Sequence, residues 1–281
     1  MPHVPDTDAP FRAADRLAAL APGFVPEIGM VLGSGLGALR EAIEDVLSLD
    51  YQALPGFPNP GVAGHAGRLI LGRIAGINVA CLHGRAHFYE GHGLGAMAVP
   101  IRVLKLLGAK ILIVTNAAGS LRPEIGPGRL VMAIDHLNLM PGTPLIGAND
   151  ARFGPRFPAL KNAYDPGLRQ AFHQAARHCH LELAEGVYAA VAGPCFETAA
   201  EIRMIARLGG DLIGMSSVPE VILARHCDLK VAMLSLIANL AEGLSAEALS
   251  HENTLRAAEA GSGALVALIR QFITQGAGSW H

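Results

Sequence analysis

Short, continuous apolar runs alternate with amphipathic stretches along most of this chain. An apolar run of four to eight residues bounded by turn residues is typical of a strand buried on both faces, whereas a longer amphipathic stretch is typical of a helix. Strands that alternate with helices predict a sheet covered by helices on both faces. The alternation therefore predicts the fold class α/β.

The predicted elements follow one another from residue 11 to residue 274. Apolar runs predict strands over residues 29–32, 68–74, 77–83, 111–116, 129–134, 186–191, 212–215 and 230–237. Amphipathic stretches predict helices over residues 11–21, 37–46, 97–107, 166–178, 198–208, 219–227 and 250–274. A Gly-Ile-Asn sequence at residues 76–78 favours a hairpin between two of the strands. We therefore expect a mixed central β-sheet flanked by helices rather than a purely parallel sheet.

Length and composition favour a single domain with a substantial core. The chain has 281 residues, of which 51% are hydrophobic and only 16% are charged. No long linker or low-complexity tract divides it, although a cluster of Pro, Gly, Asn and Asp predicts a loop-rich excursion over residues 139–166. We predict one domain over residues 1–281, with residues 1–24 as a peripheral N-terminal helical segment.

Charge and cysteine usage limit the partners and the compartment. The formal net charge of −2 argues against a nucleic-acid partner. The sequence contains no run of 18 apolar residues, so no membrane span is predicted. Residues 1–23 lack the apolar core of a signal peptide. The four cysteines, at positions 81, 179, 195 and 227, have neither CxxC nor zinc-ligand spacing. We therefore expect reduced thiols and a cytoplasmic protein.

The segment 81–89 carries the most chemistry for its length. Arg85, His87 and Tyr89 stand at every second position directly after an apolar run. If the strand continued through them, all three side chains would project from one face, because strand side chains alternate. A guanidinium fork suits phosphate, since it binds two oxygens at once. The segment predicts an anion site. The alternative is that Arg85 and His87 are merely surface residues at the end of a strand.

Three other turns have the same character. Residues 28–32 run into the sequence Gly33-Ser34-Gly35-Leu36-Gly37, residues 115–119 follow a second apolar strand, and Met215-Ser216-Ser217 follows a third. A glycine turn before a helix presents free N–H groups to an anion. Ligands in open α/β sheets collect at the carboxyl ends of strands. We expect these turns to meet the 81–89 segment at one site.

The glycine turn does not fit a nicotinamide dinucleotide. Its spacing is GxGxG rather than GxGxxG, and no acid closes a second strand about 20 residues later to hold a ribose. Asp50, the nearest candidate, precedes a proline-rich segment, and no GK[ST] sequence indicates a Walker loop. The turn is interpreted as an anion loop.

Taken together, these segments resemble the trimeric, low-molecular-mass class of purine nucleoside phosphorylases. The resemblance runs in order from about residue 28 to residue 256. It rests on the stretches 31–37, 64–68, 84–91, 114–119, 135–139, 192–198, 214–220 and 249–252. It implies a nucleoside phosphorylase-like fold, a homotrimer with sites near subunit interfaces, and neither a metal nor an organic cofactor. The implied activity is cleavage of purine nucleosides by inorganic phosphate, a co-substrate, to give free base and ribose 1-phosphate.

The resemblance also implies a role for individual residues. The phosphate site would consist of Ser34, His65, Arg85, His87, the backbone N–H of Ala117, and Ser216. The nucleoside site would consist of Tyr89, Phe157, Tyr188, Phe196, Glu197, Met215, Asn239 and His251. Phe157 would come from a neighbouring subunit to cap the sugar. Asn239, His87 and Glu197 would carry the catalysis.

The residues near the base bear on substrate choice. Ala238 stands where the family usually has Thr, and Cys195 where it has Ser or Asn. Glu197 would accept the N1–H that inosine and guanosine have and adenosine lacks. The sibling methylthioadenosine phosphorylases carry an acid where this chain has Asn239. We expect 6-oxopurine nucleosides as substrates. The alternative is methylthioadenosine phosphorylase-type activity on 6-aminopurine nucleosides, and a third possibility is a non-catalytic nucleoside or phosphate binder on the same scaffold.

Overall fold

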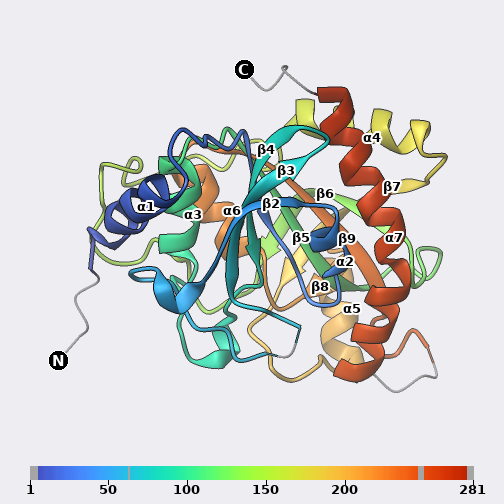
Figure 1. Ribbon diagram of the computed structural model, residues 1–281. Coiled ribbons are helices and arrows are strands. Elements are labelled where there is room, and N and C mark those ends of the chain that lie inside the picture. The colour runs from blue at the N-terminus through green and yellow to red at the C-terminus, as the bar shows by residue number, and fades with distance from the viewer. Residues whose placement is uncertain (1–5, 63, 246–249, 277–281) are drawn as a thin grey trace.

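A computed structural model describes residues 6–62, 64–245 and 250–276, and Figure 1 shows the chain. Within these ranges nine strands form one sheet in the order β2-β3-β4-β1-β5-β8-β7-β6-β9, and β5 also pairs with β9. The strands are β1 (Ile28–Val31), β2 (Glu44–Asp50), β3 (Arg68–Ile74), β4 (Ile77–His83), β5 (Ile111–Ser120), β6 (Leu130–Asn138), β7 (Leu183–Ala190), β8 (Leu212–Gly214) and β9 (Lys230–Leu240).

Seven α-helices and two short 3₁₀ segments are described around this sheet. They are α1 (Ala9–Leu20), α2 (Ala38–Glu41), η1 (Tyr51–Ala53), η2 (Phe88–Glu90), α3 (Ala98–Leu106), α4 (Pro166–His178), α5 (Ala199–Arg207), α6 (Val218–His226) and α7 (His251–Gly276). Helices α1, α3 and α6 lie on one side of the sheet, and α4 and α7 on the other (Figure 1). The phenyl rings of Phe172 and Phe272 stack 3.8 Å apart where α4 meets α7.

The sheet is mixed, as expected from the sequence. Strand β1 pairs in parallel with β4 and β5, so the carboxyl ends of these three strands lie at one edge. Strands β3 and β4 form an antiparallel hairpin, whose turn residues Ala75 and Gly76 both have positive φ. Two left-handed turn residues match the right-handed twist of a hairpin. The predicted α/β class and mixed sheet are confirmed.

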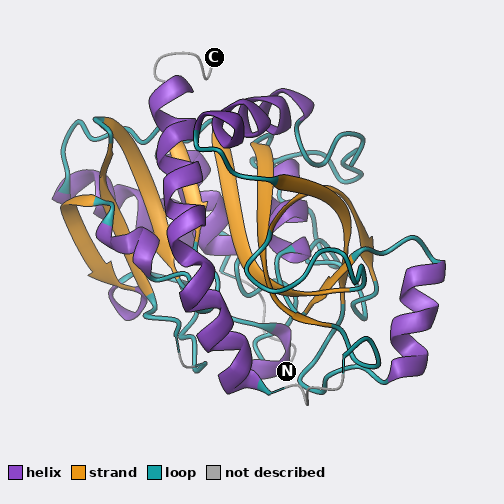
Figure 2. Cartoon of the chain, turned by 90° about the vertical axis from the view of Figure 1, so that its right-hand side faces the viewer, coloured by secondary structure: helices purple, strands orange, loops and turns teal. Residues whose placement is uncertain are grey.

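Five strands close on themselves at one end of the sheet. The pairings run from β5 to β8, β7, β6 and β9, and β9 returns to β5. Figure 2 shows long strands that curl around this part of the molecule. The long β5 belongs to both the closed and the open part of the sheet, because it also pairs with β1, whereas β9 pairs with β5 and β6. Side chains on these two strands are therefore held by pairing on more than one side.

Most predicted elements are present, and one prediction was wrong. A helix was expected over residues 37–46, but α2 covers only Ala38–Glu41 and β2 begins at Glu44. The later part of this segment forms a strand rather than a helix because it pairs antiparallel with β3, where Leu47 and Leu49 lie opposite Leu71 and Leu69. A one-turn helix has little dipole, so the glycine turn lacks the long helix that was expected behind it.

Strand lengths were also underestimated. Strands β5, β6 and β9 continue three or four residues past their predicted ends, through polar and small residues. The predicted excursion between β6 and α4 contains no helix or strand from Leu139 to Asp165. Among the residues that the structure describes, no helix is long and apolar enough to cross a membrane.

Candidate active site

The four turns singled out in the sequence converge on one cavity of about 130 Å³. Its walls come from the segments after β1, β4 and β7, from the second half of β5, from the carboxyl ends of β8 and β9 and the residues that follow them, and from α7. The predicted residues that line it are Ser34, Arg85, His87, Tyr89, Ala117, Phe196, Glu197, Met215, Ser216 and Asn239. Ten of the fourteen predicted site residues therefore share one cavity.

The route by which Arg85 and His87 reach the cavity differs from the expected one. Strand β4 ends at His83, and Gly84 turns the chain with φ of +108°. A Cβ on Gly84 would lie 2.8 Å from the Cβ of His65, so only glycine fits this turn. The residues after Gly84 are therefore loop and 3₁₀ helix, and the prediction that alternation along a strand aligns them was wrong.

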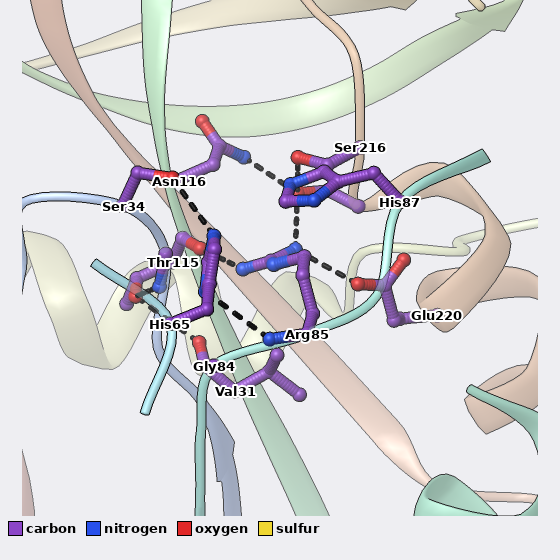
Figure 3. A network of polar contacts seen from close by, with 12 residues as sticks. Val31, Ser34, His65, Gly84, Arg85, His87, Thr115, Asn116, Ser216 and Glu220 are labelled. Atoms are coloured by element: carbon purple, nitrogen blue, oxygen red, sulfur yellow. Dashed lines mark hydrogen bonds and ion pairs between the residues drawn. The ribbon is translucent and has the colours of Figure 1, made fainter. Parts of the chain in front are cut away.

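Arg85 is a buried positive charge of the site, and several hydrogen bonds hold it in place. Its side chain is only 1% exposed, and Nη1 donates to Oε1 of Glu220 and to Oγ of Ser217, each at 2.9 Å (Figure 3). Nη2 donates to the backbone carbonyl of Thr115. A buried guanidinium is tolerable only where a countercharge and hydrogen bonds replace water. Glu220, on α6, supplies the countercharge, so the position of Arg85 is fixed by three partners on β5 and at the start of α6.

Ser217 links Arg85 to the other polar groups of the cavity. Its Oγ accepts from Nη1 of Arg85 and from Nδ2 of Asn116, both at 2.9 Å. Those two bonds use both lone pairs, so the hydroxyl hydrogen of Ser217 is the one directed at Oγ of Ser216, 3.1 Å away. The hydroxyl hydrogen of Ser216 consequently points away from Ser217. This arrangement of hydrogen bonds means that the Ser216 hydroxyl can donate only in a direction away from Ser217.

His65 orients the hydroxyl of Ser34 although it does not line the cavity. Its Nδ1 accepts from the backbone N–H of Arg85 at 3.2 Å and therefore carries no proton. The neutral ring then has its hydrogen on Nε2, which lies 2.8 Å from Oγ of Ser34. The Ser34 hydroxyl accepts from His65 and keeps its own hydrogen for another acceptor. His65 is thus placed beside the anion loop.

His87 is held by Glu90 on the same short 3₁₀ turn. Nδ1 of His87 lies 2.9 Å from Oε1 of Glu90, and the backbone N–H groups of His87 and Gly61 donate to this carboxylate at 2.6 Å. Burial and the charge of Arg85 lower the pKa of His87, and Glu90 opposes them. The ring is therefore neutral at pH 7, with its hydrogen on Nδ1 and a lone pair on Nε2.

Glu90 itself stays ionised while it performs this task. Burial acts to raise its pKa, but the N–H groups of Gly61 and His87 outweigh burial, and the pKa of Glu90 lies below its ordinary value. The ring of His87 also stacks on that of Tyr89, with centroids 4.8 Å apart. Burial raises the pKa of Tyr89 to about 12, so its phenol remains a hydrogen-bond donor.

A second group of wall residues has a different chemistry, with one acid, one amide and apolar contacts. Burial raises the pKa of Glu197, and the nearby Glu201 adds to the rise. Nδ2 of Asn239 donates to Oγ1 of Thr254, on α7, at 3.3 Å. Phe196 and Met215 supply apolar surface to the same cavity. An acid and an amide beside an aromatic ring can recognise the edge and the face of a heterocycle.

Besides His65, three predicted residues are not among the described residues that line the cavity. Tyr188, on β7, is fully buried against Gly214, and burial raises its pKa to about 12. Phe157 lies in the long excursion with 87% of its surface exposed, so it contributes nothing to the cavity of its own chain. His251 begins α7, but its side chain lies outside the part that the structure describes.

Several residues that shape the site had no predicted role. Asn116 and Thr254 line the cavity, and Glu90, Ser217 and Glu220 hold the residues that do. A carboxylate partner could have been expected for Arg85 and for His87, because a buried arginine and an oriented imidazole each require one. Thr254 stands three residues after His251, which the resemblance placed in the nucleoside site, but nothing about Thr254 itself indicated a role. In residues 6–62, 64–245 and 250–276, no group of three or more His, Cys, Asp or Glu side chains could hold a metal.

Sequence comparison shows the class of protein: the chain belongs to the phosphorylase superfamily, which it matches over residues 27–274. More particularly, it is 43% identical over 250 residues to purine nucleoside phosphorylase 1 of Bacillus subtilis. That match covers 89% of this chain and 92% of the relative. The predicted resemblance to purine nucleoside phosphorylases is thereby confirmed.

Solved structures show the same relationship. The crystal structure of Schistosoma mansoni purine nucleoside phosphorylase in complex with adenosine superimposes with a TM-score of 0.90 at 39% identity, and covers 96% of this chain and 97% of that one. The inosine complex of the same protein gives a TM-score of 0.89 at 38% identity, with 96% of both chains covered. The nucleoside phosphorylase-like fold is confirmed.

Proposed function

We propose that this chain catalyses the reversible phosphorolysis of 6-oxopurine ribonucleosides and deoxyribonucleosides, such as inosine and guanosine. The N9–C1′ bond breaks, a phosphate oxygen bonds to C1′, and the products are the free base and ribose or deoxyribose 1-phosphate. The observation that carries the proposal is that one cavity combines a buried arginine, two serines and a neutral histidine with Glu197 and Asn239. The first set suits phosphate, and the second suits a 6-oxopurine.

On the phosphate side, the groups are oriented before the ligand arrives. Arg85 supplies charge without leaving its bonds to Glu220 and Thr115, since a guanidinium has five N–H donors and three are used by Ser217 and these two partners. Ser34 and Ser216 add hydroxyl donors. The neutral His87 offers a lone pair on Nε2 to the O–H of protonated phosphate. Ala117 adds its backbone N–H. Phosphate held there would stabilise the positive charge on the sugar and then capture C1′.

On the base side, the departing purine gains negative charge. A donor placed at N7 stabilises that charge as it forms, which is the most effective use of a preorganised hydrogen bond. Asn239 would donate to N7 and contact O6, while Phe196 packs on the ring. Glu197 would accept the N1–H, a bond that only the 6-oxopurines offer. Tyr89 and Met215 would contact the ribose, and His251 and Tyr188 would lie toward its 5′ end.

We further propose that the catalytic unit is a homotrimer. Phe157 is a large aromatic ring with 87% of its surface exposed on the 139–165 excursion, a poor arrangement for a lone chain. In a trimer this ring would cap the sugar in the cavity of a neighbouring subunit. The site would then be complete only where two subunits meet.

Substrate choice separates this proposal from methylthioadenosine phosphorylase-type activity. A relative has been crystallised with adenosine, so turnover rather than binding is the discriminating measurement. We expect kcat/KM for inosine to exceed that for adenosine by at least roughly 100-fold, because adenosine leaves the carboxylate of Glu197 facing a purine nitrogen without a hydrogen. Asn239→Asp should lower the inosine-to-adenosine ratio at least about tenfold, since the new carboxylate accepts from a 6-amino group.

The control for this substitution is Asn138→Asp on β6, which makes the same chemical change outside the cavity. It should leave the ratio of kcat/KM values unchanged. A wild-type protein that prefers adenosine would overturn the 6-oxopurine assignment. A ratio that Asn239→Asp does not move would remove Asn239 from base recognition.

A further inference from the structure

Thr254 is a polar residue of the cavity wall to which the resemblance gave no role. It lies one turn into α7, half-buried, and faces the same cavity as Asn239. Its Oγ1 donates to the backbone carbonyl of Ser250 at 2.9 Å. A threonine hydroxyl has a single hydrogen, and this bond uses it. Toward every other neighbour, Thr254 can therefore only accept.

This restriction decides which way the amide of Asn239 faces. The amide approaches Oγ1 of Thr254 to 3.3 Å, and an acceptor there requires the NH₂ end rather than the carbonyl end. The opposite end of the amide lies over Gly119, where a Cβ would come within 3.0 Å of Oδ1. Gly119 stands across the β5–β9 ladder from Asn239, next to the irregularity in that pairing. The amide is thus bounded by a threonine acceptor and by a glycine without a side chain.

We infer that Thr254 is a positioning residue that holds Asn239 with its NH₂ group set to donate to the purine. This inference rests on the proposed function, in which Asn239 meets N7 and O6. One hydrogen on Nδ2 binds Thr254, and the second is left for the base. Were the amide turned over, a carbonyl lone pair would take its place, which suits a 6-amino purine better than a 6-oxopurine. Ala238, next to Asn239 on β9, has no hydroxyl with which to fix the amide, so the orientation comes from a different element.

The inference predicts a change in selectivity as well as in rate. Thr254→Val keeps the shape of the side chain but removes the acceptor. We expect kcat for inosine to fall roughly fivefold, the worth of one neutral hydrogen bond, while KM for phosphate stays within twofold. The inosine-to-adenosine ratio of kcat/KM should fall by a similar factor, because the amide is free to turn over. Thr254→Ser keeps the hydroxyl and should restore both quantities to within twofold of wild type.

A matched control exists on the same helix. Thr274 makes the same hydroxyl bond to a carbonyl four residues earlier, that of Arg270, at 2.8 Å, but lies outside the cavity. Thr274→Val should change neither kcat nor the ratio. Equal losses on inosine and adenosine in Thr254→Val, or failure of Thr254→Ser to recover, would show a merely structural role and overturn the inference. A wild-type protein without phosphorolysis would instead refute the proposed function, so the two failures are distinguishable.

Discussion

Asn239→Ala is expected to lower kcat for inosine about 100-fold while KM for inosine changes by no more than about threefold. Removing one preorganised donor from the position where negative charge develops typically costs this much in rate. Because the base carries more negative charge in the transition state than in the bound substrate, the loss falls on kcat rather than on ground-state binding. Steady-state release of hypoxanthine in saturating phosphate measures both parameters.

The design separates chemistry from folding. Asn239 lies near the carboxyl end of β9, and its side chain is only partly buried, so alanine should leave the sheet intact. Asn138→Ala, at the end of β6 and outside the cavity, is the matched control and should retain wild-type turnover. Turnover within threefold of wild type in Asn239→Ala would remove Asn239 from the mechanism.

Arg85→Met is expected to destabilise the fold as well as abolish the use of phosphate. The substitution leaves the carboxylate of Glu220 buried without its countercharge, and breaking such a pair typically costs about 3–5 kcal/mol. The thermal midpoint should fall by roughly 5–10 °C on that basis. Differential scanning calorimetry measures the fall, and hypoxanthine release measures the activity.

The double variant Arg85→Met/Glu220→Leu resolves these two effects. Replacing both partners of a buried pair with apolar residues is often neutral or stabilising, so the midpoint should return to within a few degrees of wild type. Activity should stay absent, because the charge that holds phosphate is still missing. A double variant that recovers phosphate-dependent turnover would show that Arg85 matters only for folding. An unchanged midpoint in the single variant would contradict the strength assigned to the Arg85–Glu220 pair.

Much of the fold could be predicted from local pattern because the pattern reports burial. Strands β3 and β4 and helix α4 have the predicted bounds, since each is a clear apolar run or amphipathic stretch closed by turn residues. Strand β2 could not be predicted from its own residues, because its conformation depends on pairing with β3. The later parts of β5 and β9 were missed because a closed ring of strands can carry polar residues inward, where the local sequence suggests a loop.

The residues of the candidate site, like the elements of the fold, could be predicted only in part. Ser34, Arg85 and Ser216 stand in short motifs beside strand ends, and the structure brings them to one cavity, as expected. Their assignment to a phosphate site remains a prediction. The residues that hold these side chains in place could not be predicted. Glu220 is 135 residues away from Arg85 in the sequence, and only the tertiary fold brings the two together. Thr254 was missed for the same reason. Sequence can suggest which groups bind a ligand, but which groups orient them depends on packing.

Product analysis of the reaction of inosine tests the central claim most directly. Wild-type protein and inosine are incubated with and without inorganic phosphate, and hypoxanthine and the sugar product are both quantified. The account predicts that hypoxanthine appears only with phosphate, in equal amounts with ribose 1-phosphate. Release of hypoxanthine with free ribose, independent of phosphate, would identify a hydrolase and contradict the account. No release under either condition would contradict it equally.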